Sequence, residues 1–194
     1  MKKLLHITLF FLFPLLMHAQ RSPQDSIVYL PIEEAYKRSY DAIRVEGSRP
    51  VIDGRIDEAF WQENGVWSEF FIQAEPYERS IPENKTRMKM LYDEKNIYIA
   101  VICNDKDTEA INRFLGNRDA YDLGDYVCVA FDPYHDYRAA TQFILNAGGN
   151  KSDMIVTDDM SYNTSWNAVW EGRTYIDHEN SVWYAEFRIP TEFS

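Results

Sequence analysis

The clearest pattern in the chain is a pair of apolar runs joined by a polar turn. Residues Thr86 to Tyr92 alternate between apolar and polar side chains, which is typical of a strand with one buried face. Residues Ile97 to Cys103 are apolar at nearly every position, and Asp93-Glu94-Lys95-Asn96 separates the two runs. This arrangement predicts a hairpin whose second strand is central and buried on both sides.

Further strands are predicted at near-regular intervals, with turn-forming Gly, Pro, Asn and Asp residues between them. We expect them at Ile43–Ile52, Trp67–Gln73, Asp125–Phe131, Tyr137–Leu145 and Ser152–Thr157, and in a last hairpin of Trp166–Tyr175 and Val182–Ile189. The spacing predicts an all-β fold, an antiparallel β-sandwich of the jelly-roll or immunoglobulin-like kind. In the last strand Trp183 alternates with other apolar residues, which predicts that it belongs to the core.

One short helix is expected near the N-terminal end of the sandwich. Asp53-Gly54 has the chemistry of a tight turn, because Gly accepts backbone angles that other residues avoid. Residues 57–63 then predict a helix, with Asp57 as its cap and Phe60 and Trp61 as its buried side chains. The long polar stretch from Asn104 to Gly124 predicts a loop, with room for a short helix over 108–114.

The N-terminal residues have the layout of a secretory signal peptide. Lys2 and Lys3 precede an apolar run from Leu4 to Met17, and Ala19 supplies a small residue for cleavage. The run is shorter than the roughly 20 residues that a spanning helix needs, although an uncleaved anchor is the alternative. We therefore divide the chain into a signal peptide (1–19), a linker or edge segment (20–40) and the β-sandwich (41–194), and expect export to the periplasm, the outer membrane or the extracellular space.

The charge of the chain argues against two classes of partner. The whole chain carries 20 basic and 31 acidic residues, a formal charge of −11, and loss of Lys2 and Lys3 would make it −13. Such a charge disfavours binding to nucleic acid and to anionic membrane surfaces. Cys103 and Cys128 each lie in a predicted strand, so they form either a disulfide between paired strands or two free buried thiols.

Several segments resemble, in order, the family 9 carbohydrate-binding modules. The resemblance begins at Val51–Trp61 and continues through Leu91–Val101 with Asp105 and Asp107, through Asp125–Pro133, through Trp166 to Trp170, and ends at Trp183–Pro190. It covers approximately Ile43 to Pro190. It is nearest to the variant of this domain at the N-terminus of large exported bacterial proteins, in which a region resembling an outer-membrane β-barrel follows.

The resemblance implies non-catalytic sugar binding, with a terminal sugar held between aromatic rings and surrounded by polar side chains. Flat aromatic faces contact sugar C–H groups, and amide, carboxylate and guanidinium groups bond to the hydroxyls. The candidate residues are Trp166, Asn163, Gln142, Arg118, Tyr121 and Asp122. Trp166 and Trp170 share a spacing that would also place both in the core, and the second aromatic of the site is Tyr77, Tyr121 or Tyr162.

The resemblance also implies bound calcium, and catalysis has little support. Asp105, Asp107 and Asp125 lie at predicted strand ends and offer the oxygen ligands that calcium takes, although solvated turn carboxylates would look the same. A glycosidase needs two carboxylates at a defined separation. Glu171 and Glu186 are candidates only by elimination, and Glu186 with Arg188 is better explained as an ion pair on one strand face.

Two functions are therefore open. The first is an exported carbohydrate-binding domain, an accessory module in polysaccharide binding or breakdown. The second is a structural or interaction domain with a vestigial sugar site, which packs against an outer-membrane barrel region of the same or a longer protein.

Overall fold

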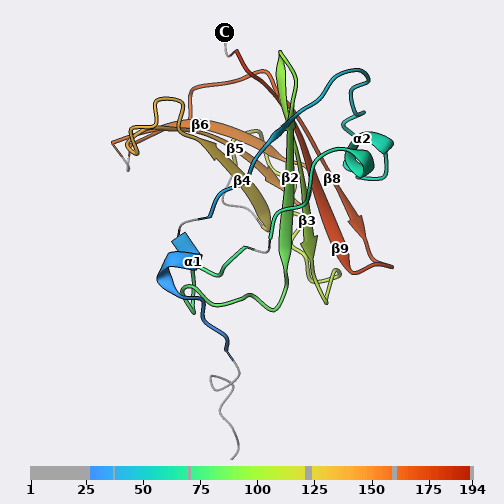
Figure 1. Cartoon of the computed structure of the whole chain (residues 1–194), viewed down its shortest axis with the longest axis vertical. Helices are drawn as coiled ribbons and strands as arrows, with labels where there is room; N and C mark the ends of the chain where they lie inside the picture. The colour runs from blue at the N-terminus through green and yellow to red at the C-terminus, as the bar shows by residue number, and fades with distance from the viewer. Residues whose placement is uncertain (1–26, 37, 70, 121–123, 159–160, 193–194) are drawn as a thin grey trace, which may run out of the picture.

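The computed structural model describes residues 27–36, 38–69, 71–120, 124–158 and 161–192, and these form two β-sheets that pack face to face (Figure 1). The five-stranded sheet has the order β1 (Ile43–Arg44), β2 (Thr86–Tyr92), β3 (Asn96–Asn104), β9 (Val182–Pro190) and β8 (Glu171–Asp177). The four-stranded sheet has the order β4 (Tyr126–Phe131), β5 (Ala140–Asn146), β6 (Lys151–Thr157) and β7 (Ser161–Asn163). Two short helices, α1 (Ile32–Tyr36) and α2 (Ala59–Glu63), precede β2. The predicted β-sandwich is confirmed.

The predicted central hairpin is also confirmed. β2 and β3 pair antiparallel from Thr86–Cys103 to Tyr92–Ile97, and β3 lies between β2 and β9. Among the strands that the structure describes, β1 alone joins its neighbour in parallel. The predicted signal peptide lies outside the described residues, and among those described no helix is long and apolar enough to cross a membrane.

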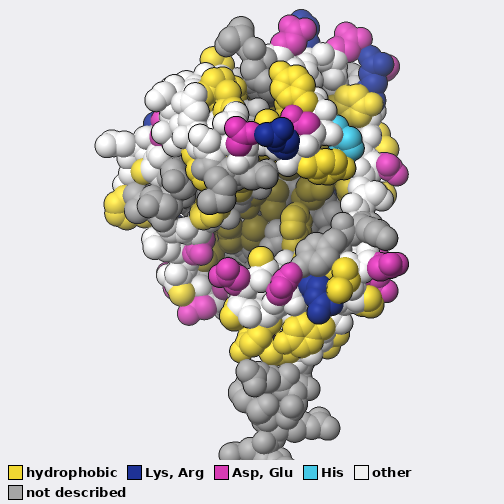
Figure 2. Space-filling model, turned by 90° about the vertical axis from the view of Figure 1, so that its left-hand side faces the viewer, with side chains coloured by type: hydrophobic (Ala, Val, Ile, Leu, Met, Phe, Trp, Pro, Cys, Tyr) yellow, Lys and Arg dark blue, Asp and Glu magenta, His cyan; other side chains and the backbone are white. Residues whose placement is uncertain are grey.

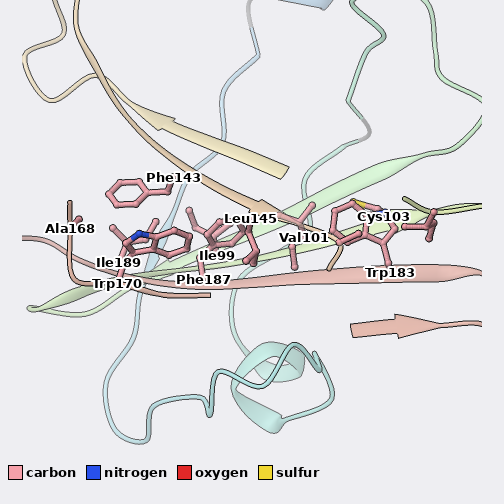
Figure 3. Packing of buried hydrophobic residues seen from close by; sticks show 13 residues of the cluster. Ile99, Val101, Cys103, Phe143, Leu145, Ala168, Trp170, Trp183, Phe187 and Ile189 are labelled. Carbon is pink, nitrogen blue, oxygen red and sulfur yellow. The ribbon is translucent and has the colours of Figure 1, made fainter. Parts of the chain in front are cut away.

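The main core fills the space between the two sheets (Figure 3). Ile99 and Val101 from β3 meet Phe143 and Leu145 from β5, and Phe187 from β9 completes the centre of the cluster. Alternation along each strand sends these side chains inward and their neighbours outward. Trp183 is only 5% exposed and belongs to this core, as its spacing predicted.

A second apolar cluster covers the outer face of the five-stranded sheet. α2 lies on the opposite side of this sheet from the main core (Figure 3). Its Phe60 and Trp61 pack against Leu91, Tyr98 and Ala100, and Trp61 is completely buried. This sheet is therefore buried on both faces where α2 covers it, which explains why the β3 run is apolar at nearly every position.

The buried carboxylate of Glu186 fastens the α2 segment to this face. Its Oε2 accepts hydrogen bonds from the backbone N–H of Asp53 (3.1 Å) and of Gly54 (3.0 Å). Its Oε1 accepts one from the Trp61 indole (2.9 Å). The predicted ion pair with Arg188 is wrong, because Arg188 bonds instead to Glu171 on β8. Among the described contacts, Glu186 supplies the buried carboxylate to which the N–H groups of this turn and of the Trp61 indole donate.

Several predicted boundaries are corrected. Most of Ile43–Ile52 is irregular, and β1 keeps only two residues. In the predicted strand 67–73, the described residues 67–69 and 71–73 lie beside β2 but do not form a strand. Ser68 N–H bonds to Met88 C=O and Phe71 N–H bonds to Thr86 C=O, a register that slips by one residue. The short helix over 108–114 does not form; that stretch has one turn, closed by Ala110 N–H to Asp107 C=O.

The helix cap and the cysteine pairing also differ from expectation. The N-cap of α2 is Glu58 and not Asp57, and its side chain accepts a bond from Val51 N–H instead of capping the helix. Cys103 is buried in the core, whereas Cys128 is exposed on the outward side of β4, and both are free. β3 and β4 belong to different sheets, so the disulfide alternative fails, and burial raises the pKa of Cys103 to about 12.

The Glu186 contact predicts a pH-dependent stability. Burial is the main cause that raises the pKa of Glu186 from 4.5 to about 7, against the lowering effect of its hydrogen bonds. Because the folded pKa is the higher one, the stabilising contribution is complete below pH 4.5 and is lost as pH rises through about 7. We expect Glu186→Gln to remove this loss. The free energy of unfolding of the wild type minus that of the variant, measured by denaturant unfolding, should therefore fall by on the order of 2–3 kcal/mol as pH rises from 4.5 through about 7. A difference that stays constant with pH would contradict it.

The close approach of the Asp53-Gly54 turn to β8 predicts a specific cost for a side chain there. Gly54 has φ +89°, and a Cβ would lie 2.7 Å from the carbonyl carbon of Thr174. Gly47 has a similar φ of +97° with nothing within 4 Å of a Cβ, which makes it a matched control for backbone strain. We expect Gly54→Ala to lower the free energy of unfolding by about 1–3 kcal/mol more than Gly47→Ala does. Equal losses would show that the turn can move away from β8.

Candidate functional site

Trp166 lies at the edge of the core and not within it. It is half-buried, and its ring meets Phe143 edge to face with centroids 6.1 Å apart. Trp170, four residues on, is only 3% exposed and stacks on Phe187 at 5.7 Å. Residues 166–170 precede β8 and are not part of it, so the two tryptophans do not share a strand face. Trp170 is core, and Trp166 keeps part of its ring at the surface.

A completely buried carboxylate, Asp153 on β6, holds this irregular segment in place. It accepts the Ala168 backbone N–H at 2.6 Å and the Trp170 indole N–H at 3.1 Å. The guanidinium of Arg118 bonds to the same carboxylate. The Lys151 ammonium adds a bond to the Trp170 carbonyl at 2.7 Å. The backbone near Trp166 is therefore held by hydrogen bonds to side chains and not by the backbone hydrogen bonds of a β-sheet.

Arg118 lies beside the Trp166 segment, but much of its guanidinium is used internally. Its Nε donates to the Asn167 side chain at 3.0 Å, and its Nη2 donates to the Ala168 carbonyl at 3.2 Å as well as to Asp153. Asn163 is exposed at the end of β7, and its Oδ1 accepts the Ser165 N–H at 3.1 Å. The structure brings Arg118, Asn163 and Trp166 to one region.

Among the other predicted sugar ligands, the described one, Gln142, is not part of this region. Phe143 and Leu145 point into the core, so Gln142 and Ile144 project from the outer face of the four-stranded sheet. Tyr121 and Asp122 lie outside the described residues. The sugar-binding roles of all six residues stay predictions.

Asp153 is not among the predicted site residues, although the strand pattern contains a signal for its role in holding the segment 166–170. Asp153 stands inside the predicted strand Ser152–Thr157, among residues that are otherwise mostly buried. A single acid inside such a strand indicates a buried carboxylate with donors around it. The sequence could not show which donors these are, because they come from a loop and from an irregular segment.

Two of the predicted calcium ligands accept hydrogen bonds from backbone N–H groups. Asp105 accepts the Asp107 N–H at 2.9 Å, and Asp125 accepts the Asn112 N–H at 2.9 Å. Among the described residues no group of three or more His, Cys, Asp or Glu side chains converges in a way that could hold a metal ion. A calcium site built on Asp105, Asp107 or Asp125 would have to draw on ligands beyond such a group, and it stays a prediction.

Comparison with known proteins supports the fold. No protein-family model matches the chain, and no curated protein matches it. Among solved structures, the chain is similar to a family 9 carbohydrate-binding module from Caldicellulosiruptor kristjanssonii in complex with cellotriose, with a TM-score of 0.54 and 17% identity over 79% of this chain and 69% of that one. It is also similar to a candidate carbohydrate-binding protein from Bacteroides uniformis, with a TM-score of 0.58 and 13% identity over 77% and 71% of the two chains. The chain thus has a fold like that of the family 9 carbohydrate-binding modules.

The different burial of the two tryptophans predicts different costs of truncation. We expect Trp170→Ala to lower the free energy of unfolding by about 3–5 kcal/mol, because it removes a buried indole and leaves Asp153 without one of its donors. Trp166→Ala should cost only about 1–2 kcal/mol, since its ring already contacts solvent. Chemical denaturation measures both, and equal large losses would show that Trp166 is core and that the binding surface is misplaced.

Proposed function

We propose that this is an exported domain that binds carbohydrate without catalysing a reaction, as an accessory module in polysaccharide binding or breakdown. The observation that carries the proposal is the likeness of its fold to a module whose structure holds cellotriose. The signal-peptide pattern in residues 1–19 supports export. The partner would be the terminal sugar of an oligosaccharide or polysaccharide.

The surface proposed for sugar binding is the region of Asn163, Trp166 and Arg118. Trp166 offers part of an indole ring at the surface, and Phe143 and the core behind it hold that ring in place. The exposed amide of Asn163 offers a donor for a sugar hydroxyl beside that ring. A rigid aromatic face with a polar neighbour is the combination that sugar recognition needs.

The alternative is an interaction domain with a vestigial sugar site. The internal bonds of Arg118 to Asn167, Ala168 and Asp153 favour it, because they leave this residue fewer donors for a ligand. Gln142 also projects from another face. In this case the domain would pack against a further region, such as an outer-membrane barrel, of the same or a longer protein.

Calorimetric titration of the domain with gluco- and xylo-oligosaccharides separates the two functions. We expect at least one trisaccharide to bind more tightly than about 1 mM, which corresponds to about −4 kcal/mol. Trp166→Ala should abolish the heat of binding at that surface while the protein stays folded. Tyr134→Ala, an aromatic residue 79% exposed on the turn after β4, is the control and should bind as the wild type does. No binding tighter than millimolar across the panel would favour the interaction domain.

A further inference from the structure

A groove of 880 Å³ lies on another part of the surface, between α1 and the irregular segment 66–72. One wall carries Glu34 of α1, with Leu30 before the helix and Arg38 after it. The opposite wall is formed by residues 66–69, 71 and 72, and Met88 of β2 also lines the groove. α1 belongs to the side of the molecule that faces the viewer in Figure 2, where the surface is hollowed over hydrophobic side chains.

The walls of this groove are fixed by hydrogen bonds before any ligand arrives. The Tyr40 hydroxyl donates to the Val66 carbonyl at 2.6 Å and accepts the Met90 N–H at 3.2 Å, so it ties the segment after α1 to both the opposite wall and β2. Ser68 exchanges two bonds with Met88, from its N–H to the carbonyl (2.8 Å) and from the Met88 N–H to its hydroxyl (2.9 Å). A preformed groove avoids the entropy cost of ordering its walls on binding.

The lining combines aromatic faces with acceptors and donors. Trp67 and Phe71 line the groove, and Phe71 is 47% exposed. The Lys89 ammonium lies 5.0 Å from the centre of the Trp67 ring, a cation–π contact that holds the indole in position. Glu34, Arg38 and Glu69 also line the groove. Carboxylates accept from hydroxyls and a guanidinium donates to them.

The charges of the lining restrict the class of ligand. Three carboxylates, Glu34, Asp41 and Glu69, line the groove together with one guanidinium, Arg38. Two further cations, Lys89 and Arg87, lie 5.0 Å and 5.6 Å from the centre of the Trp67 ring. An anionic ligand would meet carboxylates on both walls, which disfavours it. A wholly apolar ligand that filled the groove would take these polar groups out of water without giving them partners, which is costly. A neutral molecule with many hydroxyls meets neither objection, and its C–H faces suit Trp67 and Phe71.

We infer that this groove is a second glycan-binding site, which takes a neutral oligosaccharide. Its volume lies within the roughly 300–1,000 Å³ of ligand pockets in general. The inference rests on the proposed carbohydrate-binding function but uses none of the residues near Trp166. The two sites lie on different irregular segments, one beside β2 and one before β8, and share no residue.

Site-directed variants and NMR titration test the inference. The probes are cellotriose, xylotriose and mannotriose, added to the isotope-labelled domain while backbone amide shifts are followed. We expect one of them to shift amides of residues 66–72 and 38–41. Phe71→Ala and Glu69→Gln should each weaken that binding about tenfold, in keeping with the loss of one well-placed contact. Phe114→Ala is the matched control, because Phe114 is 48% exposed and does not line the groove.

The outcomes distinguish this inference from the proposed function. Shifts confined to residues 163–168 that Trp166→Ala abolishes and Phe71→Ala leaves unchanged would overturn the second site and keep the function. Shifts at 66–72 that survive Trp166→Ala but weaken in Phe71→Ala support the second site independently of the first. Absence of shifts with every trisaccharide would overturn both, and an equal loss in Phe114→Ala and Phe71→Ala would overturn the groove as the place of binding.

Discussion

The structure depends on one constraint: the five-stranded sheet has two apolar faces, and the four-stranded sheet covers only one of them. The outer face of β3 and β9 would be exposed if residues 45–64 did not fold over it. Phe60 and Trp61 supply the apolar cover, but a helix of five residues has too few internal bonds to be stable alone. Its position is set by two buried charged side chains, one from β9 and one from β2, that hydrogen-bond to this segment.

These two side chains are a buried carboxylate and a buried ammonium. Glu186 receives three N–H groups from the turn and from Trp61, and Lys89, only 2% exposed, donates to the carbonyls of Trp61 (2.7 Å) and Asn64 (2.8 Å). Burial lowers the pKa of Lys89 and raises that of Glu186, so neither charge is favoured by its surroundings alone. Each is tolerated because backbone groups that would otherwise lack partners bond to it. The two residues thus fix the α2 segment in one position.

On the other sheet, Asp153 likewise fixes the position of a segment that is not part of a strand. It lies between the sheets, where a carboxylate is costly, and it collects an indole N–H, a backbone N–H and a guanidinium. In both places a segment outside the strands is held by a buried carboxylate from a strand. The candidate sugar surface at Trp166 and the α2 segment on the outer face therefore depend on the same kind of interaction, a buried carboxylate that accepts N–H hydrogen bonds.

The elements that the sequence predicts well are those that depend on local periodicity. The β2–β3 hairpin, β4 to β6 and β9 follow from alternation and turn residues, and Trp61 and Trp183 follow from their spacing. The described residues 66–69, 71 and 72 and the segment 166–170 have strand-like composition, yet they do not form strands, because their bonds go to side chains or slip in register. The bond from Asp53 to Glu186 spans 133 positions, and no local pattern contains it. The same limit applies to the candidate site, because the type and chain position of Gln142 and Arg118 do not show that one lies on the outer face of the sheet and the other bonds to Asp153.

Arg118 shows what this means for function. Its Nε and Nη2 hold Asn167 and Ala168, the residues that follow Trp166, so it shapes the backbone of the surface to which it was assigned as a ligand. Any substitution of Arg118 would move Trp166 and remove a donor together, and a loss of affinity could not be divided between the two effects. The ring of Trp166 packs against Phe143 at the edge of the core and is half-buried. Truncation of this indole removes the aromatic face itself without removing any atom of the bonds by which Arg118 and Asp153 hold Ala168.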